Sequence, residues 1–314
     1  MQLKPLNQQV VVVVGASSGI GRDAALELAK RGAKVVVAAR SQDALASLER
    51  QIQQLGGQVI AVTADVADFD QVNAIADAAI AAFGRIDTWV HCAAAGILAP
   101  FESMTIEEFR RVIDVTLMGQ VYGAKVALPH LKQTGRGSLI AISSMEGRRA
   151  LPLQSAYSTA KHGLEGFLES LRVELEHEGH AINVTSIKPA VINTPFYNNM
   201  RTKVGVKPTG IPPYYEPRLV TDAILYAAEN PIRDYIVGDV GRLLDLGQRL
   251  SPGLLDFALT QIGFGGQRTD DLKTAQAPDG LFDPRPDSDQ IDGDFNHLTI
   301  PSLSDWLIKK LSGR

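Results

Sequence analysis

The sequence has only one cysteine in 314 residues, so no disulfide can form within the chain. A lack of disulfides is typical of proteins in reducing compartments. The N-terminal residues show no secretory signal pattern, and we therefore expect a cytoplasmic protein. No stretch approaches the ~18 to 20 apolar residues of a membrane helix, so no membrane span is expected.

The sequence also lacks an excess of either charge. Its 31 basic and 35 acidic residues give a net charge of −4, which argues against a concentrated basic face for nucleic acid. The six histidines show no metal-binding spacing such as H-E-x-x-H, so no metal site is expected. The overall composition is that of an ordinary globular protein, and the chain is long enough for one large domain.

Short apolar segments alternate with longer amphipathic ones along most of the chain. Seven segments are predicted as strands: 10–14, 34–39, 59–62, 88–91, 138–142, 183–187 and 235–237. Helices are predicted between them, at 19–31, 42–55, 68–83, from Thr105 onward, at 155–178 and at 218–229. Within the helix that starts at Thr105, Pro129 is expected to introduce a kink or an end.

Repeated strand–helix units predict an α/β fold of the Rossmann-like, doubly wound type, with a parallel sheet of about seven strands and helices on both faces. We assign residues 1–238 to this dinucleotide-binding catalytic domain. Residues 239–314 are rich in turn-forming residues, so we interpret them as a C-terminal extension packed on the core rather than an independent domain.

A glycine-rich turn follows the first strand and opens the first helix. It reads Gly15-Ala16-Ser17-Ser18-Gly19-Ile20-Gly21. Glycines let the backbone turn tightly and approach a ligand, and a helix N-terminus attracts a pyrophosphate. The sequence therefore predicts a dinucleotide site at this turn, although the spacing G-x3-G-x-G differs from the common G-x-G-x-x-G.

The second strand ends at Arg40, where an acidic residue would bind the adenosine ribose of NAD(H). A guanidinium can instead bind a 2′-phosphate, so we favour NADP(H) over NAD(H). The alternative is that Arg40 is a solvated residue at a strand end. Asp65 and Val66 close the third strand and are candidates for holding the adenine.

Tyr157 and Lys161 are four residues apart on a predicted helix and therefore share a face. An ammonium favours the phenolate and so lowers the pKa of a nearby phenol, which prepares it for proton transfer. Ser144 lies just past the fifth strand and could polarise a substrate carbonyl. Tyr157 and Lys161 could simply be a pair on the surface, and Ser144 could simply be a turn residue. The prediction of a catalytic site therefore rests on the three occurring together.

Together these motifs resemble the short-chain dehydrogenase/reductase family over roughly residues 9–238. The resemblance implies that Lys161 also holds the nicotinamide ribose, that Ile192 and Thr194 hold the carboxamide, and that two long helices form a homodimer or homotetramer. The implied cofactor residues are Gly15, Ser17, Ser18, Gly19, Ile20, Gly21, Arg40, Asp65, Val66, Ala93, Tyr157, Lys161, Pro189, Ile192 and Thr194.

The chain departs from the family pattern at several places. Thr116 stands where the family has a catalytic asparagine, and we expect its side chain or carbonyl to serve in the proton relay. Val14 replaces a threonine, Ala190 a glycine, and the four residues 91–94 an Asn-Asn-Ala-Gly segment.

The leading hypothesis is an NADP(H)-dependent oxidoreductase that interconverts a secondary alcohol and a ketone or aldehyde, with Tyr157 as acid/base. Aromatic residues between 195 and 215, including Tyr214 and Tyr215, predict an apolar carbonyl substrate. A second hypothesis is a catalytically silent NADP(H)-binding regulatory or structural protein. A third places the function in the extension, docking a membrane or a partner.

Overall fold

A computed structural model describes residues 2–285 and 288–311 of the chain. At its centre is a seven-stranded sheet with the strand order β10-β7-β6-β4-β1-β2-β3, all paired in parallel. Its strands are β1 (Val10–Val14), β2 (Lys34–Ala39), β3 (Val59–Thr63), β4 (Thr88–His91), β6 (Gly137–Ile142), β7 (Ile182–Pro189) and β10 (Asp234–Val237). The predicted doubly wound α/β fold is therefore confirmed.

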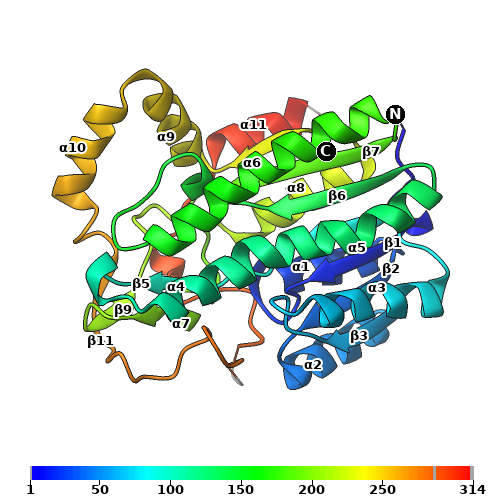
Figure 1. The fold of residues 1–314 in the computed structure, drawn as a ribbon, viewed down its shortest axis with the longest axis horizontal. Helices are drawn as coiled ribbons and strands as arrows, with labels where there is room; N and C mark the ends of the chain where they lie inside the picture. The colour runs from blue at the N-terminus through cyan, green and yellow to red at the C-terminus, as the bar shows by residue number, and fades with distance from the viewer. Residues whose placement is uncertain (1, 286–287, 312–314) are drawn as a thin grey trace.

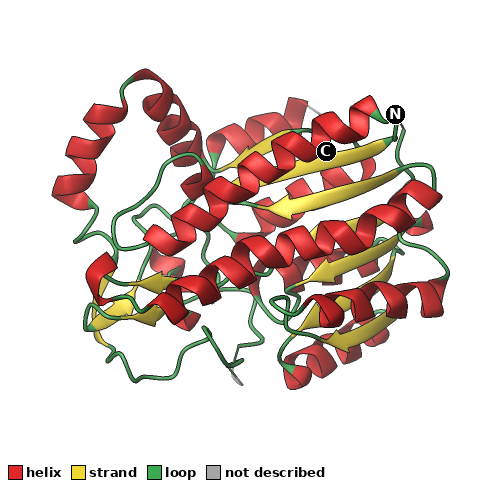
Figure 2. Ribbon diagram, viewed as in Figure 1, coloured by secondary structure: helices red, strands yellow, loops and turns green. Residues whose placement is uncertain are grey.

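Helices cover both faces of the sheet (Figures 1 and 2). One layer holds α1 (Gly19–Lys30), α2 (Gln42–Gln54) and α8 (Pro217–Glu229), and the other holds α3 (Phe69–Phe83), α5 (Gly119–Gln133) and α6 (Ser155–His177). Alternate side chains of β1 enter the two cores, with Val11 and Val13 in one and Val12 and Val14 in the other. Burial on both faces explains why β1 is continuously apolar.

The helix that begins after Thr105 is interrupted. Thr105 and Glu108 form the capping box expected from the sequence, but α4 (Ile106–Ile113) passes into a π-helical turn, Asp114–Met118, before α5 starts. Of the two expectations for Pro129, a kink or a helix end, the helix end is wrong, because α5 continues to Gln133. A proline so close to a helix end removes a single backbone donor, and the last turn survives that loss.

The C-terminal residues divide into two parts. A helical hairpin of α9 (Asp239–Leu250) and α10 (Pro252–Ile262) projects from one end of the molecule (Figure 1), and Leu254 on α10 is 64% exposed. The chain then forms β11 (Arg268–Leu272), which pairs antiparallel with β9 (Val206–Pro208). A long loop follows and leads to α11 (Leu303–Leu311) (Figure 2). Smaller elements complete the fold: β5 (Ile97–Leu98), β8 (Arg201–Thr202) and α7 (Phe196–Asn199).

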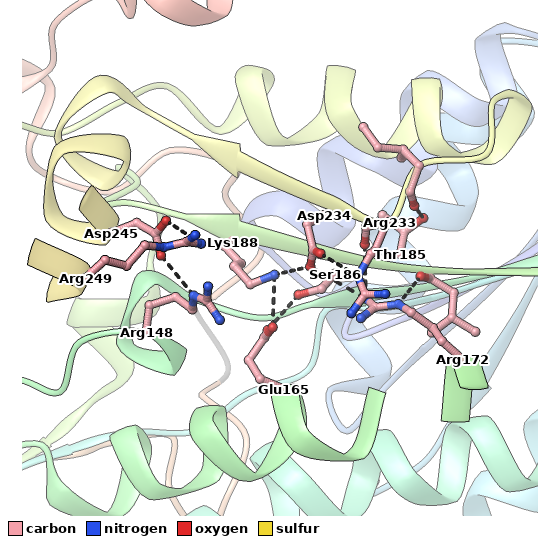
Figure 3. Close-up of polar contacts among 12 residues, drawn as sticks. Arg148, Glu165, Arg172, Thr185, Ser186, Lys188, Arg233, Asp234, Asp245 and Arg249 are labelled. Carbon is pink, nitrogen blue, oxygen red and sulfur yellow. Dashed lines mark hydrogen bonds and ion pairs between the residues drawn. The ribbon is translucent and has the colours of Figure 1, made fainter. Parts of the chain in front are cut away.

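A buried ion cluster fastens the sheet edge to helix α6 (Figure 3). The Lys188 side chain on β7 is only 3% exposed and forms ion pairs with Glu165 of α6, at 2.9 Å, and with Asp234 of β10. Glu165 also accepts a hydrogen bond from the Ser186 hydroxyl at 2.7 Å. Because Glu165 lies one turn beyond Lys161, this cluster sets the position of α6 against the sheet.

We expect Lys188→Met to destabilise the fold by about 3 to 5 kcal/mol, because it leaves the buried Glu165 carboxylate without its counter-ion. Urea unfolding at neutral pH measures the loss. Arg233→Met is the matched control: Arg233 pairs with the same Asp234 but is 62% exposed, so its loss should cost less than about 1 kcal/mol. Equal costs for the two variants would contradict the prediction.

Candidate active site

A cavity lies at the carboxyl ends of the central strands, where strand order reverses between β1 and β4. Every catalytic or cofactor-binding residue that the sequence suggested lines this cavity except Thr116. They are Gly15, Ser17, Ser18, Gly19, Ile20, Gly21, Arg40, Asp65, Val66, Ala93, Ser144, Tyr157, Lys161, Pro189, Ile192 and Thr194. Residues spread over 180 positions of sequence thus meet in one place.

The glycine turn leaves no room for side chains. A Cβ on Gly21 would lie 2.2 Å from the Gly15 carbonyl oxygen, and one on Gly15 would lie 2.5 Å from the Ala93 nitrogen. Gly15 and Gly19 have φ angles of 82° and 55°, which glycine adopts most easily. The first turn of α1 holds no acidic residue, and the Ser18 side chain makes no capping hydrogen bond. The residues of the turn itself therefore include no acidic group that would repel a phosphate.

Two arginines face the corner of the cavity at the end of β2. Arg40 donates hydrogen bonds to the carbonyl oxygens of Phe282 (2.7 Å) and Gly280 (2.6 Å) in the extension. Arg111 donates to Asp65 at 2.6 Å. Burial, and then the nearby charge of Arg111, lower the pKa of Arg40 from its ordinary value. The corner therefore holds two guanidinium groups, with the carboxylates of Asp65 and Asp283 nearby, and is partly enclosed by the extension.

Tyr157 and Lys161 lie one turn apart in the first half of α6, as the spacing predicts. The Lys161 ammonium is 5.5 Å from the centre of the Tyr157 ring and donates to the Ile142 carbonyl oxygen at 2.7 Å. Both side chains are buried, with exposures of 8% and 1%. Ser144 contributes a hydrogen bond that favours the Tyr157 phenolate.

The electrostatics of these two groups are dominated by burial. Burial, and then the Glu146 carboxylate, raise the pKa of Tyr157 well above its ordinary value, whereas the Ser144 hydrogen bond lowers it. Burial lowers the pKa of Lys161 to about 8, against the opposing charges of Glu165, Cys92 and Glu146. The expected lowering of the Tyr157 pKa is therefore not seen, and the phenol keeps its proton at neutral pH.

Thr116 lies outside the cavity, with an exposure of 0%. Its hydroxyl accepts from the Ala95 nitrogen (3.0 Å) and donates to the Ala95 carbonyl oxygen (3.1 Å). It sits in the π-helical turn between α4 and α5, where the backbone hydrogen-bond pattern changes. The side chain thus fastens this turn to the loop after β4 and does not face the cavity.

The substrate side of the cavity differs from the expectation. Tyr214 and Tyr215 were expected to border it, but both are completely buried elsewhere. The Tyr214 hydroxyl bonds to Thr209 and Gly210, and its ring stacks on Phe295 at a centroid distance of 4.7 Å. Aromatic rings are as suited to a core as to a pocket, and pattern alone does not separate the two. Phe196 and Tyr197 do line the cavity, as expected.

Glu146 is a lining residue that the sequence reasoning missed. Its carboxylate accepts from the Ser158 hydroxyl at 2.7 Å, and burial raises its pKa to about 8. The feature of the sequence that could have identified Glu146 as a site residue is its position two residues after Ser144. Cys92 also borders the cavity, and burial raises the pKa of its thiol to about 12, so it is not a thiolate.

A second group of missed residues comes from the extension. Residues 279–285 and 288–296, which we call the strap, pass along the open side of the cavity. Gly280, Pro284, Arg285 and Ser288 of the strap belong to its lining. The Gln290 carbonyl oxygen accepts a hydrogen bond from the Gly19 nitrogen at 2.8 Å, directly at the glycine turn. No local motif signals these contacts, because they join residues about 270 positions apart.

Comparison with known proteins identifies the class. The family model "short chain dehydrogenase" matches residues 9–205, which is more than half of the chain. The oxidoreductase YxnA of Bacillus subtilis is 38% identical over 287 residues, covering 90% of this chain and 80% of that protein. The chain therefore belongs to the short-chain dehydrogenase family and is an oxidoreductase with the nucleotide-binding fold of that family.

Solved structures agree with this assignment. An alcohol dehydrogenase from the archaeon Thermococcus sibiricus, in complex with 5-hydroxy-NADP, is 26% identical with a TM-score of 0.64, covering 73% of this chain and 94% of its own. A metagenomic short-chain oxidoreductase in complex with NADP is 29% identical with a TM-score of 0.62, covering 73% and 96%. Both proteins match over about three quarters of this chain.

No helix within residues 2–285 and 288–311 is long and apolar enough to span a bilayer. The same residues contain no group of three or more His, Cys, Asp or Glu side chains placed to hold a metal ion.

Proposed function

We propose that the protein is an NADP(H)-dependent dehydrogenase/reductase that interconverts a secondary alcohol and its ketone or aldehyde, with Tyr157 as the acid/base. The observation that carries this proposal is the shared cavity: Ser144, Tyr157 and Lys161 line the same space as the glycine turn. A nucleotide bound at the turn and a carbonyl beside Tyr157 would therefore be in contact.

The cavity residues fit a dinucleotide. The collisions that a Cβ would make at Gly15 and Gly21 show that the turn is shaped for close backbone approach, and the helix start behind it carries no acidic side chain. Pro189 ends β7 and Ile192 and Thr194 follow it, with Thr194 against Gly19 of the turn; we propose that these three residues hold the nicotinamide. Lys161 is placed to hold its ribose.

Reduction needs a hydride at the carbonyl carbon and a proton at the oxygen. When bound, the reduced nicotinamide supplies the hydride. Ser144 holds the carbonyl oxygen with a hydrogen bond, and Tyr157 donates its proton to that oxygen as the alcohol forms. The Lys161 ammonium then stabilises the phenolate until a proton from solvent restores it. Because its pKa lies above the ordinary value, Tyr157 is protonated at neutral pH and has a proton to donate.

The test is the oxidation of NADPH, followed by absorbance, with a panel of ketones and aldehydes. We expect turnover, with bulky apolar carbonyls preferred over polyols because Phe196 and Tyr197 line the cavity. If folded protein turns over nothing in a panel on which another family member is active, the enzymatic proposal fails. Tight NADPH binding under those conditions would favour the silent binding protein.

The choice of NADP(H) rests on Arg40, with Arg111 beside it. We expect Arg40→Ala to weaken NADPH binding about ten- to hundredfold relative to NADH, because charge-assisted hydrogen bonds to the 2′-phosphate are lost. Fluorescence titration of both nucleotides measures the ratio of the two Kd values. Arg31→Ala, which removes an exposed arginine at the end of α1, should leave the ratio unchanged. An unchanged ratio in Arg40→Ala would overturn the NADP(H) assignment.

Three further expectations stay proposals. We propose that residues 239–314 belong to the catalytic unit and do not form an independent domain, since the strap lines the cavity. We also propose a homodimer or homotetramer formed through the two long helical segments, α4–α5 and α6, and a cytoplasmic location. Light scattering and cell fractionation test the last two.

A further inference from the structure

The strap is fastened to the core on both sides of the cavity. On one side, Asp279 pairs with Arg201 at 2.8 Å and the Gly280 nitrogen donates to the Asn199 carbonyl oxygen at 2.7 Å. On the other side, the Phe295 nitrogen donates to the Asn193 side chain at 3.0 Å. Leu281 and Phe295 are buried, at 1% and 5% exposure. These contacts hold the strap residues between them against the nucleotide cavity.

One strap residue in this position carries a full positive charge. Arg285 lines the nucleotide cavity and also an adjoining cavity of about 290 Å³. The two cavities share Pro195, Asn199, Arg285 and Ser288, so Arg285 stands at their junction. The Pro195 ring approaches the glycine turn closely, since a Cβ on Gly19 would lie 3.8 Å from its Cδ. Arg285 thus shares both cavities with Pro195, which lies next to the glycine turn.

The adjoining cavity has an excess of positive charge. Its lining contains Lys207, Lys273 and Arg285 but a single carboxylate, Asp294, which pairs with Lys207. Arg285 and Lys273 both donate to the Asn198 carbonyl oxygen, at 3.2 and 3.1 Å. Among residues 2–285 and 288–311, neither has a carboxylate within ion-pair distance. Two cations held together by one neutral acceptor repel each other, and a bound anion would relieve that repulsion.

We propose that Arg285 of the C-terminal extension is a further cofactor-binding residue, which contacts the pyrophosphate of the dinucleotide, with Lys273 supporting it from the adjoining cavity. The inference rests on the proposed function, because it needs a dinucleotide in the cavity. A guanidinium matches phosphate oxygens with two parallel donors, and Ser288 offers a hydroxyl beside it. The extension is then part of the cofactor site, and the glycine turn binds the other side of the same phosphates.

The pyrophosphate is common to both nucleotides, and this makes the proposal testable apart from the choice of NADP(H). Removing Arg285 should raise the Kd of NADPH and of NADH by the same factor, about ten- to hundredfold. Arg285→Ala is compared with Arg268→Ala, an exposed arginine of β11 outside both cavity linings, which should change neither Kd. Lys273→Met should raise both values by a smaller factor. Inorganic pyrophosphate should compete with NADH for the native protein and compete less well for Arg285→Ala.

The Kd values of NADPH and NADH, measured by direct binding, distinguish the possible outcomes. A rise in the Kd of NADPH alone would assign Arg285 to the 2′-phosphate and overturn the proposal, as would no rise for either nucleotide. If the native protein binds no dinucleotide, the proposed function itself fails. Thermal unfolding verifies that each variant is folded. Should Arg285→Ala not fold, Arg285→Gln keeps a hydrogen-bond donor without the charge, and the same equal rise in both Kd values is expected.

Discussion

Tyr157→Phe should lower kcat/KM for carbonyl reduction by a factor of about 10² to 10⁴, while NADPH still binds. The substitution removes only the phenolic oxygen, so the carbonyl loses its proton donor but the ring still packs against Phe196. The neighbouring hydroxyl of Ser158 already donates to Glu146 and does not line the cavity, so it is not placed to replace the phenol. Initial rates at several pH values measure the loss.

Tyr197→Phe is the matched control for this experiment. Tyr197 lines the same cavity and contacts Phe196, but no lysine lies one helical turn beyond it. We expect the control to change KM for bulky substrates more than kcat. Activity of Tyr157→Phe within about tenfold of the native protein would contradict the assignment of Tyr157 as acid/base.

The parts of this molecule that sequence could predict are those with a local physical cause. A strand buried on both faces must be continuously apolar, and this placed β1 and β2. Helix periodicity fixed the relation of Tyr157 to Lys161, since residues four apart share a face. The strand–helix alternation then required the carboxyl ends of the strands to meet, and the suggested site residues gather there.

The parts that could not be predicted depend on long-range packing. Tyr214 has the same chemistry as a pocket residue, and only its contact with Phe295 shows that it belongs to the core. Thr116 was suggested for the relay by its place in the family pattern, yet its hydroxyl is used by the Ala95 backbone. Arg285 reaches the cavity only because Leu281 and Phe295 fasten the strap. No local pattern encodes such contacts, which are decided by the net burial of the whole chain.

We expect Lys161→Met to lower kcat/KM by about 10² or more, since the ammonium that stabilises the Tyr157 phenolate is lost. Because the pKa of Lys161 is about 8, the native rate should fall above that pH as the ammonium is lost, and this fall should be absent from the variant. Lys125→Met, at an exposed position on α5, controls for the loss of a positive charge and should leave the profile unchanged.

A stability measurement on the same variant tests whether the lysine is as strongly desolvated as its surroundings imply. The folded pKa of Lys161, about 8, is below its unfolded value of 10.5. The unfolded chain therefore binds one more proton between these values, and the native protein should gain stability as pH rises through this window. The gain relative to Lys161→Met should be about 3 kcal/mol, at ~1.4 kcal/mol for each pKa unit.

The pKa of Glu146 is close to that of Lys161, but its titration changes the stability of the protein in the opposite direction as pH rises. Its folded pKa of about 8 is above the ordinary 4.5, so the stability it contributes is lost as pH rises from about 4.5 to 8. Most of that loss is complete below pH 8, where the titration of Lys161 begins. Glu146 is also present in both proteins compared, the native protein and Lys161→Met. The difference in urea unfolding free energy between pH 8 and pH 10.5 therefore reports mainly on Lys161. A constant difference over that range would show that the ammonium is not desolvated in the folded protein, and the lowered pKa would be wrong.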